Sequence, residues 1–164
     1  MATHAHPESD ANREGELGRA GFVLGLGLGG FLDGIVLHQL LQWHSLVSER
    51  RSRDTLDGLE ANVLADGLFH VATWLLVLLG LGLLWRAARP RSRPLDTRAL
   101  LGWGIAGWGA FNLLDSVVNH FLLELHHIRQ GDDELAYDLA FLALGVLLVV
   151  VGWLVARRRP VRQT

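Results

Sequence analysis

Apolar residues in this chain gather into four long stretches, separated by shorter polar and charged segments. Each stretch is close to the roughly 20 apolar residues that a helix needs to cross a bilayer. The pattern predicts spans at about 21–46, 61–85, 99–125 and 135–156. It indicates an all-α integral membrane protein, a four-helix bundle whose first partner is the lipid bilayer. Residues 19–156 form the transmembrane domain, between a polar N-terminal tail (1–18) and a basic C-terminal tail (157–164).

The basic residues are distributed unevenly between the segments that flank the predicted spans. All 15 are arginines, and eleven of them lie before the first span, between the second and third spans, or after the fourth span. Arginine-rich flanking segments stay in the cytoplasm, so both termini are expected there, in a multi-pass protein of the inner or plasma membrane. The formal net charge of −2 gives no support to nucleic-acid binding.

The first and third spans share a pattern of polar residues and glycines at a constant offset of 82 positions. These two spans run in the same direction, because one span separates them. We interpret the pattern as a parallel repeat of two helical hairpins, related by a pseudo-twofold axis along the membrane normal. The aligned pairs are Asp33 and Asp115, His38 and His120, Gln42 and Glu124, His44 and His126, Gly25 and Gly107, and Gly27 and Gly109.

Histidines from three spans are expected at a similar depth in the membrane. With a rise of about 1.5 Å per residue, His38, His70 and His120 lie roughly 10 Å below the outer ends of their helices. Ionisable side chains inside a bilayer are costly, and their default interpretation is functional. The three imidazoles therefore predict a bound metal or cofactor in the outer half of the bilayer.

Carboxylates and further histidines accompany these three imidazoles. Asp66 and His70, and likewise His120 and Glu124, are four residues apart and share a helix face. Each pair can supply two ligands to one ion. Alternatively, the carboxylate can accept the other N–H of the imidazole and so orient the ring. The candidate metal ligands are His38, His70, His120, Glu124, Asp66, His44, His126 and His127.

A second set of polar residues is expected to support these ligands or to relay protons. Its members are Asp33, Asp115, Asn119, Gln42 and Asp138. Two readings stay open at this point. Asp33 and Asp115 could instead pair with each other in a protonated form, and His44, His126 and His127 could be interfacial residues without a ligand role.

The available side chains limit the chemistry of such a site. The chain has no Cys and a single Met, so thiolate and internal thioether ligands are missing. Imidazole and carboxylate groups suit Zn, Cu(II) or Fe. We expect a small integral membrane metal-binding protein that acts in redox chemistry or metal handling. The sequence assigns no catalytic residue and leaves an enzymatic activity open.

Two other functions fit the same residues. His38 and His120 could be the axial ligands of a b-type haem, which would make the chain an electron-transfer protein. Asp33, Asp66, Asp115 and Asp138 could instead form a proton or ion pathway. Four helices are few for a transporter, so the pathway would need a homodimer, whereas electron transfer would need a membrane redox partner.

Three blocks of the sequence resemble a known family. They are FLDGIVLHQLLQWH from Phe31 to His44, DGLFH from Asp66 to His70, and N-x-x-D-x-x-x-N-H followed by H-H-x-R from Asn112 to Arg129. The blocks resemble the signatures of a bacterial family of predicted four-span membrane proteins classed as a domain of unknown function. The resemblance covers nearly the whole chain apart from its tails. The resemblance implies the four-span topology and supports the His and Asp residues chosen as candidate site positions. It implies no particular reaction.

Overall fold

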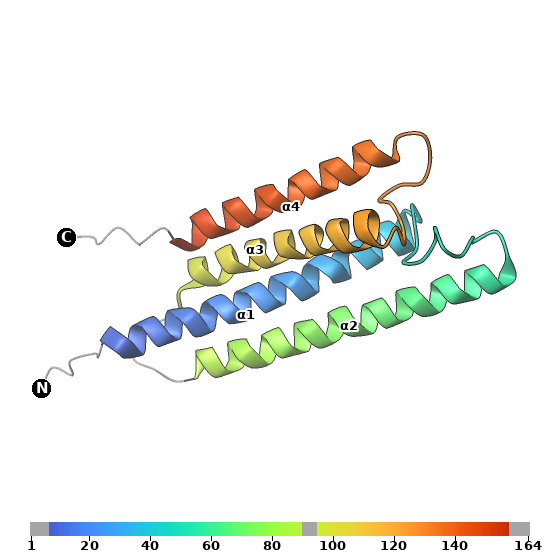
Figure 1. Cartoon of the computed structure of the whole chain (residues 1–164). Helices are drawn as coiled ribbons and strands as arrows, with labels where there is room; N and C mark the ends of the chain where they lie inside the picture. Colours follow the sequence, from blue (N-terminus) through green and yellow to red (C-terminus); the bar gives the residue numbers. More distant parts are fainter. Residues whose placement is uncertain (1–6, 90–94, 158–164) are drawn as a thin grey trace, which may run out of the picture.

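The computed structural model describes residues 7–89 and 95–157, and throughout these residues the regular structure is helical. The predicted all-α class is therefore confirmed. The two inner helices, α1 and α3, each continue into a π-helical segment, η1 and η2 (Figure 1). The elements in chain order are α1 (Pro7–Asp33), η1 (Gly34–Leu40), α2 (Leu56–Ala88), α3 (Thr97–Asp115), η2 (Ser116–Leu122) and α4 (Glu134–Arg157).

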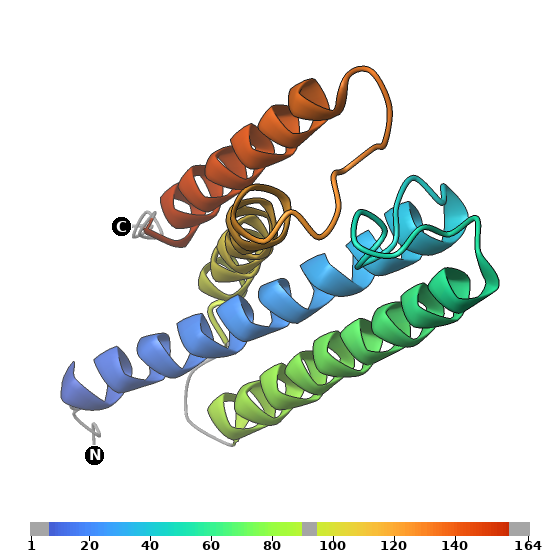
Figure 2. The ribbon, with the colours of Figure 1, turned by 45° about the vertical axis from the view of Figure 1, so that its right-hand side comes forward.

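The four long helices lie in the order α2, α1, α3, α4, with α1 and α3 in the middle (Figures 1 and 2). The closest packing joins α1 to α3, α3 to α4, and α1 to α2. Helices α1 and α3 run in one direction while α2 and α4 run in the other, as a parallel repeat of two hairpins requires. The predicted four-helix architecture is confirmed, and the start of α1 and the end of α4 lie at the same end of the molecule.

The outer surfaces of the helices are apolar, which suits a lipid environment. Leu64, Leu147 and Leu154 are examples of large side chains that are exposed on α2 and α4. Three helices of the described chain are long and apolar enough to cross a membrane: Glu14–Leu40, Leu56–Ala88 and Glu134–Arg157. The helix α3 is not among them. Its glycines, tryptophans, Asn112 and Asp115 lower its hydropathy, yet it lies between α1 and α4.

Glycines bring the two inner helices into backbone contact. A Cβ atom at Gly25 would collide with the carbonyl oxygen of Gly104, and one at Gly107 would collide with the carbonyl oxygen of Phe22. The two contacts exchange under the offset of 82 residues, so they are the same contact seen from each repeat. Small residues that allow such close approach are typical of helix pairs in membranes. This crossing places the ends of α1 and α3 next to each other.

The inner helices end earlier than the sequence pattern predicts, at Leu40 and Leu122 rather than near residues 46 and 125. In each case the chain leaves the helix through a left-handed residue, Gln42 with φ 52° and Glu124 with φ 46°. A residue in this conformation is a common helix stop, because the backbone can then satisfy the last free carbonyls. The two stops are again 82 positions apart.

The π-helical turns change which residues lie side by side. In an α-helix, residues five apart point about 140° away from each other, since each residue turns about 100°. In a π-helix the backbone bonds join residues five apart, so these residues lie on one side. The turns η1 and η2 thereby bring Asp33 next to His38 and Asp115 next to His120. Regular α-helical geometry would instead place the two side chains of each pair on different sides of the helix.

Parts of the predicted tails and of one loop are not described. The predicted polar tail 1–18 is helical from Pro7 onward, whereas residues 1–6 lie outside the described chain. The same holds for 90–94 in the arginine-rich loop and for 158–164 in the basic C-terminal tail. The cytoplasmic position of the termini stays a prediction from the arginine distribution.

Candidate metal centre

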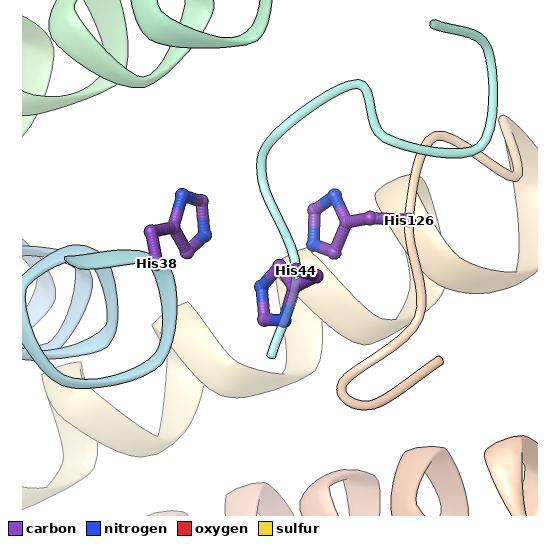
Figure 3. A group of neighbouring side chains, drawn as sticks. All are labelled: His38, His44 and His126. Atoms are coloured by element: carbon purple, nitrogen blue, oxygen red, sulfur yellow. The ribbon is translucent and has the colours of Figure 1, made fainter. Parts of the chain in front are cut away.

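Four buried histidines meet at the end of the molecule where η1 and η2 stop. We call His38, His44, His120 and His126, together with Asp33 and Asp115, the histidine cluster. The ring centroids of His38 and His44 are 4.5 Å apart, those of His44 and His126 are 4.5 Å apart and those of His120 and His126 are 4.8 Å apart. Figure 3 shows His38 at the end of its helix and His44 and His126 on two separate loops.

Each of the two loop histidines is held by the backbone of the other repeat. The Nδ1–H of His44 donates to the carbonyl oxygen of Ile128 at 2.8 Å, and that of His126 donates to the carbonyl oxygen of Leu46 at 3.0 Å. A carbonyl oxygen can only accept, so both protons must be on Nδ1. The Nε2 atoms then carry lone pairs. Both are buried and have no hydrogen-bond partner.

The two helix histidines are oriented by carboxylates of the outer helices. The Nδ1 atom of His38 lies 2.8 Å from Oδ1 of Asp66, and that of His120 lies 2.9 Å from Oδ1 of Asp138. The same carboxylates accept backbone N–H groups from the loops, Leu46 to Asp66 at 2.7 Å and Ile128 to Asp138 at 2.9 Å. Each outer helix therefore fixes one imidazole and one loop at once.

The inward atoms of the cluster are imidazole nitrogens and carboxylate oxygens. The Nε2 atom of His38 lies 3.3 Å from Oδ2 of Asp33, and that of His120 lies 3.0 Å from Oδ2 of Asp115. The Nε2 atom of His126 is 3.7 Å from the same Asp115 oxygen. The Nε2 atoms of all four histidines lack a hydrogen-bond partner, as does one carboxylate oxygen of each aspartate. Buried polar atoms are normally paired, so this set points to a missing positive group.

Two phenylalanines complete the walls of the cluster. The ring of Phe69 stacks on His38 with centroids 5.5 Å apart and planes at 13°, and Phe141 stacks on His120 at 5.9 Å and 22°. Sequence analysis did not single out these residues as part of the site. The signal was present, because Asp66 to Phe69 and Asp138 to Phe141 share the spacing D-x-x-F. Each outer helix, α2 and α4, therefore contributes one carboxylate and one aromatic ring next to the cluster.

Burial controls the protonation of His44. Burial lowers the pKa of His44 to about 2, helped by the neighbouring His126 and His38 and opposed by the bond to Ile128. A neutral imidazole is the form that binds a metal. By contrast, partial burial lowers the pKa of the nearby His127, but its bond to Asp138 and the charge of Glu134 outweigh this and raise it above the usual value.

The two loops that carry His44 and His126 are tied to each other. The backbone N–H of Glu49 donates to the carbonyl oxygen of Leu125 at 3.0 Å, and the guanidinium of Arg50 donates to that of Leu123 at 2.8 Å. The guanidinium of Arg129 lies over the rings of Trp43 and Tyr137, 5.7 Å and 5.3 Å from their centroids. These contacts keep the loop backbones in register around the cluster.

The structure does not bring every sequence-predicted ligand into the cluster. Asp66 lies behind His38 rather than facing the centre. His70 donates from Nδ1 to the carbonyl oxygen of Asp66 at 2.7 Å, and its ring contacts Phe31 and Phe69. The predicted convergence of His38, His70 and His120 is replaced by one in which the loop histidines take the place of His70.

The remaining predicted residues lie at the surface or at the edge of the cluster. Glu124 and Gln42 are exposed at the left-handed turns, and the carbonyl oxygen of Gln42 accepts from Arg53. His127 is partly exposed and bonds through Nδ1 to Oδ2 of Asp138 at 2.6 Å. Asn119 donates to Oδ1 of Asp115 at 2.8 Å.

A comparison with known protein families places most of the chain in a described family. The model of a family described as "Predicted membrane protein (DUF2243)" matches residues 20–159. No curated protein and no solved structure matches the chain. The matched range includes the whole histidine cluster and all four helices except the first part of α1.

Proposed function

The chain belongs to this family of predicted membrane proteins, and we propose that it is an integral membrane protein that binds a transition metal in the histidine cluster. The observation that carries the proposal is the convergence of four buried imidazoles, whose Nε2 atoms have no hydrogen-bond partner, beside the carboxylates of Asp33 and Asp115. A metal ion supplies the positive charge and the lone-pair acceptor that this set of atoms lacks.

The surroundings of the cluster support the same conclusion. Ligating histidines in metal proteins usually donate their other N–H to a carboxylate or a backbone carbonyl, which fixes the tautomer. Here Asp66 and Asp138 face two of the Nδ1 atoms, and the carbonyl oxygens of Leu46 and Ile128 accept from the other two. All four imidazoles therefore present Nε2 to the centre.

The ligand atoms available in the cluster narrow the choice of metal ion. Imidazole and carboxylate ligands suit Zn, Cu(II) and Fe, while the absence of Cys and of any Met beyond the first residue disfavours Cu(I). The cluster lies at the end of the molecule opposite the start of α1. With cytoplasmic termini this end is the outer one, so we place the metal in the outer half of the bilayer. We propose that the bound metal serves redox chemistry or metal handling.

The packing of the rings disfavours the haem alternative. A haem between His38 and His120 would need a flat slot between their Nε2 atoms. The rings of His44 and His126 fill this region, because they stack on each other at 4.5 Å and each contacts one of the proposed axial ligands at 4.5 Å and 4.8 Å. A metal ion needs no such slot.

Elemental analysis of protein purified in detergent from metal-replete cells tests the proposal. We expect at least one equivalent of Zn, Cu or Fe per chain, and a lower metal content in His44→Ala and in His126→Ala. Glu124→Gln is the matched control, since Glu124 belongs to the sequence-predicted ligands but is exposed and outside the cluster. A metal-free wild-type protein, or equal metal content in the wild type and both histidine variants, would contradict the proposal.

A further inference from the structure

The histidine cluster divides into two equivalent halves. The offset of 82 residues relates Asp33, His38 and His44 to Asp115, His120 and His126, so each half holds one carboxylate and two imidazoles. The supporting contacts repeat as well, with Asp66 and Phe69 behind one half and Asp138 and Phe141 behind the other. Resting on the proposed function, we infer that the cluster holds two metal ions, one in each half.

The distances within one half fit the ligands of a single ion. Bonds of about 2.0–2.1 Å to a tetrahedral metal place neighbouring ligand atoms about 3.3 Å apart. In the second half, Nε2 of His120 and Nε2 of His126 lie 3.0 Å and 3.7 Å from Oδ2 of Asp115. In the first half, Nε2 of His38 lies 3.3 Å from Oδ2 of Asp33.

Two groups of three residues have ligand atoms within 4.8 Å of one another: His38 with His44 and His126, and Asp115 with His120 and His126. His126 belongs to both groups, but its Nε2 lone pair can bind one ion only. Assigning it to Asp115 and His120, which come from its own repeat, leaves His38 and His44 with Asp33. Asp33 is in neither group of three but lies 3.3 Å from His38, and we assign it as the third ligand of the first half.

Three protein ligands per ion leave a fourth position open. Structural zinc sites close all four positions with protein ligands, whereas sites with three protein ligands bind a water or a substrate at the fourth. The rings of His44 and His126 stack at 4.5 Å, so the two halves adjoin. The open positions are therefore close enough to share one small oxygen-donor ligand, as in other two-metal sites.

Metal titration of the whole protein tests the inference. Metal-stripped protein in detergent is loaded with Cu(II) or Zn(II), freed of excess ion and analysed for metal and protein. We expect two ions per chain, and one ion in either Asp33→Asn/His38→Gln or Asp115→Asn/His120→Gln. One ion in the wild type overturns the two-ion site but keeps the proposed function, and no bound ion overturns both.

Electron paramagnetic resonance of the Cu(II)-loaded protein gives a second readout that does not depend on variants. Two adjoining Cu(II) ions couple, so the wild type is expected to show less than a tenth of the signal that its copper content would give as isolated ions. The paired variants, checked for helicity by circular dichroism, should recover the full signal of one isolated Cu(II). A wild-type signal that accounts for all bound copper as isolated ions overturns the inference.

Discussion

The tautomers of two loop histidines decide what the cluster can bind. His44 and His126 donate from Nδ1 to backbone carbonyls of the opposite repeat, which leaves Nε2 unprotonated in a buried site. If the protons were on Nε2 instead, the same rings would offer donors to the centre and repel a cation. The metal site therefore depends on two backbone hydrogen bonds that link the loops of the two repeats.

This assignment predicts the nitrogen spectrum of the histidines. Protein labelled with ¹⁵N-histidine should show Nδ1 protonated and Nε2 unprotonated in both His44 and His126 at pH 8, and in His44 also at pH 5. The reason for His44 is that its pKa, lowered to about 2, lies far below this range, so no second proton binds. A doubly protonated His44 at pH 5, or Nε2-protonated rings at pH 8, would show that the tautomers are wrong.

The two left-handed residues make a prediction about stability. At an ordinary helical position Gly is less favourable than Ala by about 1 kcal/mol. At Gln42 this order should reverse, because φ is 52° there and a side chain in that conformation costs about 1–2 kcal/mol. Gln42→Gly should unfold at a higher denaturant concentration than Gln42→Ala.

Gln39 is the matched control for this comparison, since it is exposed within η1. Gln39→Ala should be more stable than Gln39→Gly. If Ala is the better residue at both positions, the left-handed turn at the end of η1 does not form.

At the scale of the elements, the π-helical turns and the glycine crossing act together. The crossing of α1 and α3 sets the distance between the two repeats, and η1 and η2 then turn Asp33 and Asp115 toward the imidazoles of the same helix. π-helical turns are rare and are frequently found at functional sites. Their presence in both repeats at equivalent positions ties them to the cluster.

Added side chains at the crossing should separate the inner helices. Gly25→Ala and Gly107→Ala each place a Cβ against a backbone carbonyl of the other helix. Each is expected to lower the free energy of unfolding by about 1–3 kcal/mol, the usual effect of overpacking. The measurement is chemical unfolding in detergent, followed by circular dichroism.

Gly67→Ala provides the matched control, because a Cβ at Gly67 meets no other atom within 4 Å. This variant should be as stable as the wild type or more stable by up to about 1 kcal/mol, since Ala is the better helix former. Equal losses at all three positions would show that the loss reflects general sensitivity to substitution rather than the crossing.

At the scale of the whole molecule, the apolar pattern and the repeat predicted most of the fold. Four helices, their parallel pairing and the participation of His38 and His120 follow from spacing alone. The site geometry did not follow, because α-helical geometry was assumed through residue 46. The π-helical turns and the left-handed stops move Gln42 and Glu124 outward and fold His44 and His126 inward. No local sequence signal distinguishes this ending from a continued α-helix.

The orientation in the membrane is predicted by arginine distribution and can be measured directly. The chain has no Cys, so a single introduced cysteine can be labelled without background. In intact cells or spheroplasts, a membrane-impermeant maleimide should label Ser52→Cys, in the loop beside the cluster. Thr97→Cys, at the start of α3, should be labelled only after the membrane is permeabilised. The reverse pattern would place the cluster on the cytoplasmic side.

The most direct measurement is an anomalous difference map, recorded at the absorption edge of the bound metal, from crystals of the protein purified with that metal. Our account predicts anomalous peaks among the Nε2 atoms of His38, His44, His120 and His126, with Asp33 and Asp115 beside them. It is contradicted if the metal peak lies elsewhere, or if the four imidazoles are ordered as described here and no anomalous peak lies between them.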